Sequence, residues 1–394
     1  MNKRQVIVIG AGPGGATTAC FLAKAGVDVL LLDKETWPRD KICGDMQSLF
    51  TYDIFKQMGI YEEAVEAAAI EYSHFIFSGV ENEIINLDVN NTFLRGYVTR
   101  RYVIDDIVRR SAITNGADFM EDFEVTELIV ERGYVKGVRG LYRNKPMEIR
   151  ADAVVIANGS HSMQARQLGI WNEDPDMVFY AARGYYENVG GIDMNAIEVH
   201  YPDQMFLPSG YMWVFPEEEA NKVANVGVYI PSRSLEKSGM RLEDFFTWWR
   251  DNTKIGKKRL GEARLLGEIK GWRITTCRQL GEVTVNGAIL VGAAGNHEEC
   301  WGGGGYATAV IMGMIGAQVL AKALSEGDVS KENLQEFPRM YGAAWNPYYK
   351  SMVDLMENTF NTSENVSKFL NELKNNPEYP ILAKMENNPL TKAR

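Results

Sequence analysis

The chain has few of the residues that build disulfide frameworks or metal centres. Its 394 residues include four cysteines and four histidines. The cysteines are too scattered for a disulfide framework or a zinc site, and their use predicts a reducing, cytoplasmic location. The histidines are isolated from one another in the sequence, so we expect no metal site. These residues are Cys20, Cys43, Cys277 and Cys300, and His74, His161, His200 and His297.

Positive charge and long apolar runs are also lacking. The 42 lysines and arginines are outnumbered by 52 acidic residues, and a net charge of −10 argues against broad nucleic-acid binding. No apolar run reaches the roughly 18–20 residues of a membrane span. The nearest approach, residues 306–321, is rich in glycine and alanine and favours a buried helix. Met1 leads almost directly into an apolar strand, so we expect no signal segment. The sequence has no Gly-x-Ser-x-Gly elbow or other hydrolase motif.

What the chain does have is a dinucleotide-binding pattern near its start. Residues 6–26 read VIVIGAGPGGATTACFLAKAG, an apolar strand followed by Gly10-x-Gly12-x-x-Gly15 and a helix. Gly10 permits a tight turn, Gly12 lets the backbone approach a pyrophosphate, and Gly15 lets the helix pack close to the strand. A second apolar strand ends at Asp33, where a carboxylate accepts hydrogen bonds from a ribose. In this context the glycines predict dinucleotide binding and not merely a turn.

Several later segments return to this first domain. Residues 102–115 predict a helix, and residues 153–157 predict a strand that rejoins the first sheet. Residues 288–292 predict another buried parallel strand, followed by a glycine loop and a long helix. Between these pieces, residues 175–275 are rich in aromatic and β-branched residues and predict a separate antiparallel sheet.

We therefore predict an α/β (α+β) chain with a discontinuous Rossmann-like nucleotide-binding domain. An antiparallel β-sheet substrate domain is inserted into it, and a helical segment follows. The expected boundaries are 1–70, 99–170 and 276–327 for the nucleotide-binding domain, 71–98 and 171–275 for the substrate domain, and 328–394 for the helical segment.

Four segments together resemble one protein family. Besides the GAGPGG turn they are residues 38–45 (PRDKICGD), residues 211–216 (YMWVFP) with 225–229 (NVGVY), and residues 291–306 (VGAAGNHEECWGGGGY). In these segments the chain resembles flavoproteins of the para-hydroxybenzoate hydroxylase superfamily and, more narrowly, the geranylgeranyl reductase family. The resemblance reaches from the start to about residue 325. It implies that the nucleotide is FAD and that reduced FAD saturates isoprenoid carbon–carbon double bonds.

The loop 38–45 follows the ribose-binding acid and, by the resemblance, passes beside the flavin and the substrate. Arg39 and Lys41 would neutralise phosphate or flavin oxygens. A cysteine at the position of Cys43 lies near the reacting alkene in the family. As a thiol, Cys43 is either a proton donor or a compact, buried wall of the cavity.

The segment 211–216 places Tyr211, Trp213 and Phe215 on one face of a strand. Such an aromatic face suits an extended apolar molecule lying over the flavin, and the alternative is that it forms the core of the sheet itself. One departure from the family is Tyr229, which replaces the second glycine of a Gly-x-Gly. A phenol ring there would shorten or reshape a substrate tunnel. Trp301 is a further candidate substrate contact.

The segment 291–306 resembles the family's second flavin fingerprint. The run from Gly302 to Gly305 would turn backbone N–H groups and a helix dipole towards the flavin pyrimidine oxygen. Two family residues are missing, since Ala293 replaces an aspartate and Cys300 replaces a proline. Losing the aspartate removes a hydrogen bond worth about 0.5–1.5 kcal/mol, so FAD would bind more weakly without being excluded. His297, Glu298 and Glu299 form either a solvated loop or a local acid/base set.

Together these segments give the candidate sites. The catalytic candidates are Cys43, Tyr211 and Trp213, and the substrate candidates are Tyr211, Trp213, Phe215, Tyr229 and Trp301. The cofactor-binding candidates are Gly10, Gly12, Pro13, Gly14, Gly15, Asp33, Lys34, Arg39, Lys41, Cys43, Gly44, Asp45, Arg101, Val125, Gly159, Gly292, Ala293, Gly303, Gly304, Gly305 and Tyr306.

The predicted function is that of an FAD-dependent oxidoreductase that delivers a flavin hydride to an apolar or isoprenoid alkene. The proton would come from Cys43, a tyrosine or water. The expected partners are a small apolar substrate such as a prenyl lipid and an electron donor, either NAD(P)H or a ferredoxin-like protein, with peripheral membrane contact.

One alternative is a monooxygenase or halogenase acting on an aromatic substrate, although Tyr211 and Phe215 replace the Trp and Ile of the halogenase Trp-x-Trp-x-Ile-Pro motif. The other alternative is a flavin-binding or carrier protein without catalysis.

Overall fold

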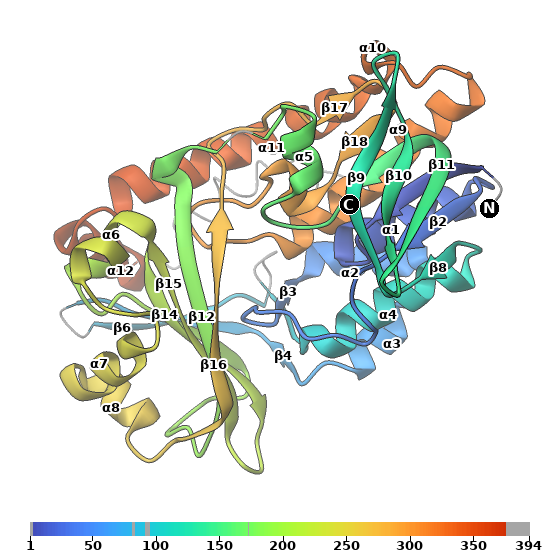
Figure 1. Ribbon diagram of the computed structural model, residues 1–394. Helices are drawn as coiled ribbons and strands as arrows, with labels where there is room; N and C mark the ends of the chain where they lie inside the picture. Colours follow the sequence, from blue (N-terminus) through green and yellow to red (C-terminus); the bar gives the residue numbers. More distant parts are fainter. Residues whose placement is uncertain (1–2, 81–82, 91–94, 172, 376–394) are drawn as a thin grey trace.

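The computed structural model describes residues 3–80, 83–90, 95–171 and 173–375 (Figure 1). The predicted nucleotide pattern forms the centre of the first sheet, whose order is β17-β18-β11-β1-β2-β8. The strand β1 pairs in parallel with β2 and β11, and β11 pairs in parallel with β18. These strands are β1 (Arg4–Ile9), β2 (Val29–Leu32), β8 (Asp118–Met120), β11 (Lys145–Ile156), β17 (Thr284–Val285) and β18 (Ala288–Leu290). The predicted return of residues 153–157 and 288–292 to this sheet is confirmed, and the hairpin β9 (Phe123–Glu131) and β10 (Tyr134–Tyr142) extends from β11.

Helices α1 (Pro13–Lys24) and α9 (Tyr306–Ser325) each follow a parallel strand, so they point in the same direction. They pack closely because Gly14 and Gly313 carry no side chain. A Cβ on Gly14 would lie 3.3 Å from the Ala309 carbonyl oxygen, and one on Gly313 would lie 2.6 Å from the Gly14 carbonyl oxygen. By length and composition α9 is long enough to cross a membrane, but 61% of its apolar window is buried, as expected for a core helix. Helix α4 (Arg101–Thr114) also packs on α1.

The second sheet has the order β16-β12-β15-β14-β13-β5-β6 (Figure 1). Its strands are β5 (His74–Ser78), β6 (Ile84–Asp88), β12 (Val178–Glu187), β13 (Ala196–His200), β14 (Tyr211–Glu218), β15 (Val223–Pro231) and β16 (Arg264–Thr275). The sheet was predicted to be antiparallel, but β13 and β5 pair in parallel. The two strands are far apart in the sequence, so no hairpin turn constrains their relative direction.

The remaining elements surround the two sheets. A small sheet, β3 (Met46–Ser48), β7 (Gly96–Val98) and β4 (Ile70–Tyr72), lies near helices α2 (Leu49–Met58) and α3 (Tyr61–Glu66). Helix α5 (Met163–Gln167) contacts β9. Helices α6 (Ser232–Ser238), α7 (Asp244–Asn252) and α8 (Lys254–Leu260) cover one face of the second sheet, where Met212 and Val214 of β14 are buried.

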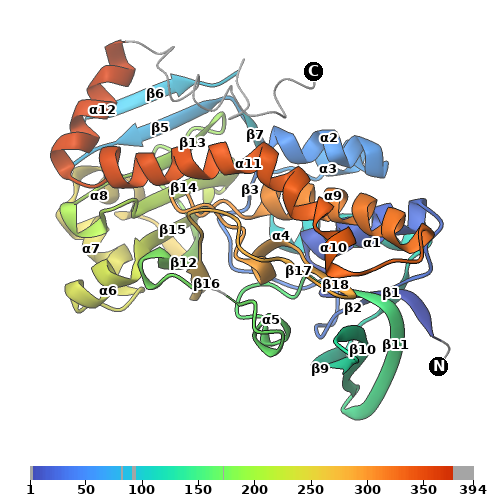
Figure 2. The same cartoon turned by 90° about the horizontal axis from the view of Figure 1, so that it is seen from above.

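The other face of the second sheet is covered by the end of helix α11 (Glu336–Asp354), a π-helical turn (Leu355–Thr359) and α12 (Ser363–Asn375). Helix α10 (Lys331–Leu334) instead contacts α9 and β17. Figure 2 shows α11 running from α9, beside the first sheet, to α12, beside β5 and β6. The helical prediction for residues 328–394 is therefore confirmed as far as residue 375, and residues 376–394 lie outside the described residues.

Candidate active site between the two sheets

The glycine turn has the geometry that the sequence predicts. Gly10 has φ +97°, and a Cβ on it would lie 2.5 Å from the Ala157 carbonyl oxygen. A Cβ on Gly15 would lie 1.9 Å from the Gly10 carbonyl oxygen, so only glycine fits. Gly12 faces open space whose nearest atom is an Arg39 nitrogen at 3.5 Å from its Cβ position. Pro13 starts α1, and no side chain caps the N–H groups of its first turn. The turn thus presents free donors to an anion.

Asp33 lies directly after β2, as predicted, and only 8% of it is exposed. Its carboxylate accepts hydrogen bonds from the Ala11 N–H at 2.7 Å and the Glu35 N–H at 2.9 Å. Burial raises the pKa of Asp33. Each carboxylate oxygen can accept a further bond, so the turn and a ribose can share the group. Lys34, by contrast, is exposed and forms an ion pair with Glu35, so its side chain belongs to the surface.

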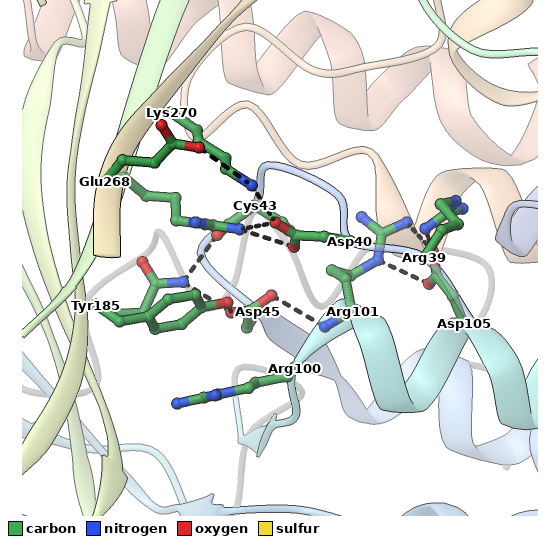
Figure 3. Close-up of polar contacts among 12 residues, drawn as sticks. Arg39, Asp40, Cys43, Asp45, Arg100, Arg101, Asp105, Tyr185, Glu268 and Lys270 are labelled. Carbon is green, nitrogen blue, oxygen red and sulfur yellow. Dashed lines mark hydrogen bonds and ion pairs between the residues drawn. The ribbon is translucent and has the colours of Figure 1, made fainter. Parts of the chain in front are cut away.

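Three cations converge beside the turn. Asp105 accepts two hydrogen bonds from Arg101, at 2.7 and 2.8 Å, and a third from Arg39 at 2.7 Å (Figure 3). Lys41 has no ion pair among the described residues, and its pKa is lowered by burial and by Arg101 and Arg39. One carboxylate therefore faces three positive charges, and the excess suits a bound pyrophosphate. The free donors of α1 and this excess charge fit FAD.

The loop 38–45 is anchored to the second sheet at its end. Asp45 has φ +66° and is fully buried. Its carboxylate accepts hydrogen bonds from the Tyr185 hydroxyl at 2.7 Å, the Asn225 amide at 2.8 Å and the Arg101 N–H at 3.2 Å (Figure 3). The Asn225 amide also donates to the Cys43 carbonyl at 2.8 Å. Asn225 thus bonds to the backbone of the loop as well as to its terminal acid.

The middle of the same loop is held by ion pairs. Asp40 accepts from Arg183 at 2.8 Å and from Lys270 at 3.2 Å (Figure 3). Together with Tyr185 these three residues line an open cavity of about 470 Å³. The loop therefore spans the two sheets: Arg39 reaches the first domain, and Asp40 reaches the second.

The aromatic face of β14 lies against this loop, as the alternation predicts. A Cβ on Gly44 would lie 2.7 Å from the Phe215 ring. The Trp213 indole N–H donates to the Asn225 side-chain oxygen at 2.9 Å. Tyr211 donates its hydroxyl to the Gly302 carbonyl at 2.7 Å, which ties the face to the glycine run.

Tyr229 and Trp301 extend this aromatic face. Tyr229 stacks on Phe179, with ring centroids 4.6 Å apart, and donates to the Cys300 carbonyl at 3.3 Å. Trp301 packs on Phe360 of the C-terminal segment with centroids 5.4 Å apart. The substrate candidates therefore lie together, packed against the C-terminal helical segment, and share a buried cluster with its residues.

Cys43, one of the predicted proton sources, lies within electrostatic reach of several of these groups. Burial raises the pKa of Tyr211, and Glu299 and Cys43 raise it further. Cys43 also affects the pKa values of Arg101, Lys41 and Tyr306. The fold therefore brings the loop that carries Cys43 against the aromatic face of β14, beside the cations Arg39 and Lys41 of the same loop.

Three polar residues of the segment 291–306 are buried, so the prediction of a solvated loop there is wrong. His297 is fully buried, Glu298 is 9% exposed and Glu299 is 3% exposed. Burial lowers the pKa of His297 to about 3 and raises that of Glu298 to about 7. Glu299 accepts hydrogen bonds from the N–H groups of Trp301, Gly302 and Gly304. The glycine run supplies N–H donors to Glu299 and, at Gly305, space for Glu298.

The remaining cofactor candidates lie in several separate segments. Gly303, with φ +68°, is packed so closely on Tyr229 that a Cβ would lie 2.9 Å from its ring. Gly305 caps α9, and the ring of Tyr306 lies 4.9 Å from the Arg101 guanidinium. Gly292 and Ala293 begin a short 3-10 turn beside α9. The Val125 carbonyl accepts from Gln164, and Gly159 has φ +82° with open space around it.

Some residues of this candidate site escaped the sequence interpretation. Asn225 lies within a quoted motif and Asp105 within a predicted helix, but neither received a role, and Tyr185, Arg183 and Glu217 lie outside every motif. Burial raises the pKa of Glu217 to about 8, and Glu217 accepts from Arg100 at 2.7 Å. Polar residues inside the apolar strands β12 and β15 were the available signal. Among the described residues, no group of three His, Cys, Asp or Glu side chains is placed to hold a metal ion.

Comparisons with known proteins agree with this geometry. A family model described as an FAD binding domain matches residues 3–331. A digeranylgeranylglycerophospholipid reductase of Methanoculleus marisnigri is 28% identical over 346 residues, which cover 87% of this chain and 82% of the relative. A geranylgeranyl bacteriochlorophyll reductase-like protein of Thermoplasma acidophilum has a TM-score of 0.84 and 22% identity, covering 98% of this chain and 97% of that one. A flavin-dependent brominase has a TM-score of 0.82 and 17% identity, covering 98% and 93%.

Proposed function

Because the chain belongs to the family of proteins built on this FAD binding domain, we propose that it is an FAD-dependent reductase of carbon–carbon double bonds in an isoprenoid lipid. The names of its relatives support this substrate class. The single observation that carries the proposal is that the Cys43 loop lies on the aromatic face of β14, joined to Trp213 through Asn225 and beside a cluster of cations. An enzyme that adds a hydride and a proton to an apolar alkene needs these groups together.

In this proposal the first turn of α1 and the cations Arg39, Lys41 and Arg101 hold the pyrophosphate of FAD, and Asp33 holds a ribose. When bound, reduced FAD supplies a hydride to one carbon of the double bond, and the protein supplies a proton to the other carbon. Residues 1–70, 99–170 and 276–327 form the cofactor-binding unit, and residues 71–98 with 171–275 form the substrate unit.

Cys43 is the proposed proton source. Its thiol proton passes to the second alkene carbon, and the thiolate left behind faces Lys41 and Arg101. Water then returns a proton to the thiolate. Tyr211 has its hydroxyl bonded to Gly302 and serves to position the aromatic wall.

The apolar chain of the substrate would lie along Trp213 and Phe215, under the C-terminal helices. These rings belong to one buried cluster with Met352, Leu355 and Phe360. Admitting a prenyl chain therefore requires the C-terminal segment to move away from β14 or to share its apolar surface with the substrate. A membrane or carrier would deliver such a substrate. We further propose that the electrons come from a small diffusible donor such as NAD(P)H or from a ferredoxin-like protein.

The test is anaerobic reoxidation. The FAD-loaded protein is reduced, mixed with prenyl lipids that differ in head group and unsaturation, and followed by flavin absorbance. We expect reoxidation with at least one lipid, together with a product heavier by two hydrogens. Cys43→Ser should keep FAD and slow reoxidation about 10²–10⁴-fold. The matched variant Cys277→Ser should also keep FAD, and its flavin should reoxidise at the rate of the unaltered chain.

Two outcomes would contradict the proposal. No reoxidation by any prenyl lipid would remove the substrate class, and an unchanged rate in Cys43→Ser would remove Cys43 as the proton source. Stoichiometric oxygen consumption stimulated by an aromatic compound would instead favour the oxygenase or halogenase chemistry of the brominase-like neighbours. A flavin carrier without catalysis is not proposed, because the relatives are named as reductases.

A further inference from the structure

The glycine run before α9 is a nest of backbone N–H groups, and the chain fills it with its own carboxylate. One Glu299 oxygen accepts from the N–H groups of Gly302 at 2.9 Å and Gly304 at 2.8 Å, and the other accepts from Trp301 at 2.8 Å and Gly302 at 3.0 Å. Successive N–H groups that converge in this way make a site for an anion. Here the anion is part of the protein.

The nest is shaped around this carboxylate. A Cβ on Gly302 would lie 2.9 Å from a Glu299 oxygen, and a Cβ on Gly304 would lie 3.1 Å from the same atom. Side chains at either position would crowd the carboxylate. The glycines therefore serve Glu299 directly and not only the backbone turn.

The charge of Glu299 is not neutralised by a basic side chain. Among the described residues, no lysine or arginine forms an ion pair with it. Its surroundings are aromatic and apolar: Tyr201, Tyr211, Tyr229, Tyr348 and Cys300 all have pKa values raised by burial and raised further by Glu299. Burial raises the pKa of Glu299 itself, and the three N–H donors oppose that effect. A carboxylate held by N–H groups in such a place projects its field over several ångströms.

We propose that Glu299 is a built-in anion that occupies the glycine nest and sets the reduction potential of the bound FAD. This inference rests on the proposed function and places the flavin ring at the start of α9, where the glycine run ends and Tyr306 meets Arg101 of the proposed FAD site. A free nest would donate hydrogen bonds to the pyrimidine oxygen and stabilise the negative charge of the reduced ring. With the nest filled, Glu299 instead opposes the negative charge that reduction adds. The cofactor is then held at a lower potential, as a stronger hydride donor suited to an unactivated alkene.

Equilibrium reduction of the FAD-loaded protein against a reference dye tests this. Glu299→Gln keeps an acceptor for the N–H groups and removes the charge, so its midpoint potential should be more positive than that of the unaltered chain. Glu299→Asp keeps the charge, and its potential should stay near the unaltered value. Glu243→Gln makes the same chemical change at an exposed position outside the site and should have no effect.

A second variant tests the nest itself. Glu299→Ala empties the nest, and its potential should also rise. Added acetate supplies a carboxylate of the right size and should lower the potential again in this variant while leaving Glu299→Gln unchanged. Thermal melting of every variant shows whether it is folded, and Glu299→Ala with acetate carries the test if Glu299→Gln does not fold.

Equal midpoint potentials in the unaltered chain and in folded, FAD-loaded Glu299→Gln would overturn the inference, as would the absence of an acetate effect in Glu299→Ala. These failures are separate from failure of the proposed substrate. If no prenyl lipid reoxidises the flavin but the potentials shift as expected, Glu299 keeps its role and only the substrate class falls. A chain that holds no FAD would remove both proposals.

Discussion

Glu298 is a buried carboxyl group with little to support its charge. One of its oxygens has no hydrogen-bond partner among the described atoms, and Lys41 is the one basic group that acts on its pKa. Burial raises that pKa to about 7. The missing side chain of Gly305 makes room for it, since a Cβ there would lie 2.7 Å from the Glu298 Cγ. Glu298 is therefore mostly neutral in mildly acidic solution and charged in alkaline solution.

The stability of the protein should reflect this titration. A carboxyl group with a raised folded-state pKa holds its proton more tightly when folded, so its contribution is complete below about pH 4.5 and is lost as pH rises to about 7. A shift of this size corresponds to about 3 kcal/mol. Glu298→Gln cannot ionise and should lose less free energy of unfolding between pH 5 and pH 8. Urea unfolding of both proteins at the two pH values measures the difference, and Glu243→Gln is the control. If the free energy of unfolding depends on pH equally in Glu298→Gln and in the unaltered chain, the raised pKa of Glu298 is contradicted.

His297, Glu298 and Glu299 show that the type of a residue alone does not predict its burial. Such residues are seldom fully buried, so the sequence favoured a solvated loop over a local acid/base set. Their burial depends on the φ angles of the glycine run and on the N–H groups that it turns inward, which no residue type reveals. Gly10, Gly15 and Asp33 were predictable because the tight turn follows from local covalent geometry alone.

At the scale of elements, the loop 38–45 is joined to β15 by one side chain. Asn225 accepts from Trp213 and donates both to the Cys43 carbonyl and to Asp45. Without the Asn225 side chain three buried polar groups lose a partner, and each unpaired group lowers the free energy of unfolding by about 1–3 kcal/mol. The placement of Cys43 therefore depends on a strand that lies far away in the sequence.

Asn225→Ala should loosen this loop more than it disturbs the sheet. We expect a loss of about 2–4 kcal/mol in the free energy of unfolding, because buried groups are left unpaired. Trypsin should also cut faster after Arg39 and Lys41, since both lie in the loop. Mass spectrometry of timed digests locates the cuts. Asn221→Ala, which removes an exposed asparagine on the same hairpin, is the matched control. Identical cleavage in the two variants would show that Asn225 does not hold the loop.

The sequence predicted the strands better than it predicted which distant strands and side chains they pair with. Strand β14 was placed with the correct face inward because alternation is a local property: Trp213 and Phe215 share one core, and Met212 and Val214 share the other. The parallel pairing of β5 with β13 was missed because it depends on a distant chain crossing. Asp40 was likewise not expected to bond Arg183 and Lys270, since neither belongs to a motif.

At the scale of the whole molecule, α11 belongs to both hydrophobic cores. Its first half places Phe337, Tyr341 and Trp345 in the core of the first sheet, and its end places Met352 in the core of the second. Tyr348 packs against both cores. Figure 2 shows this helix spanning the two sheets. A single helix shared in this way should couple the two sheets during unfolding.

Met352→Ala therefore tests whether the molecule unfolds as one unit. Met352 is fully buried in the second core, and its truncation should cost about 2–5 kcal/mol. If α11 couples the cores, hydrogen exchange should quicken by the same factor in β14 and in β1, although Met352 is not part of the core around β1. Met340→Ala changes the same residue type on the same helix at a position 42% exposed, and it should alter neither strand. Faster exchange confined to β14 would mean that the sheets open independently. In that case a substrate could enter beside β14 while the FAD domain stays folded. If α11 couples the two cores, opening the second sheet in this way would also loosen the first.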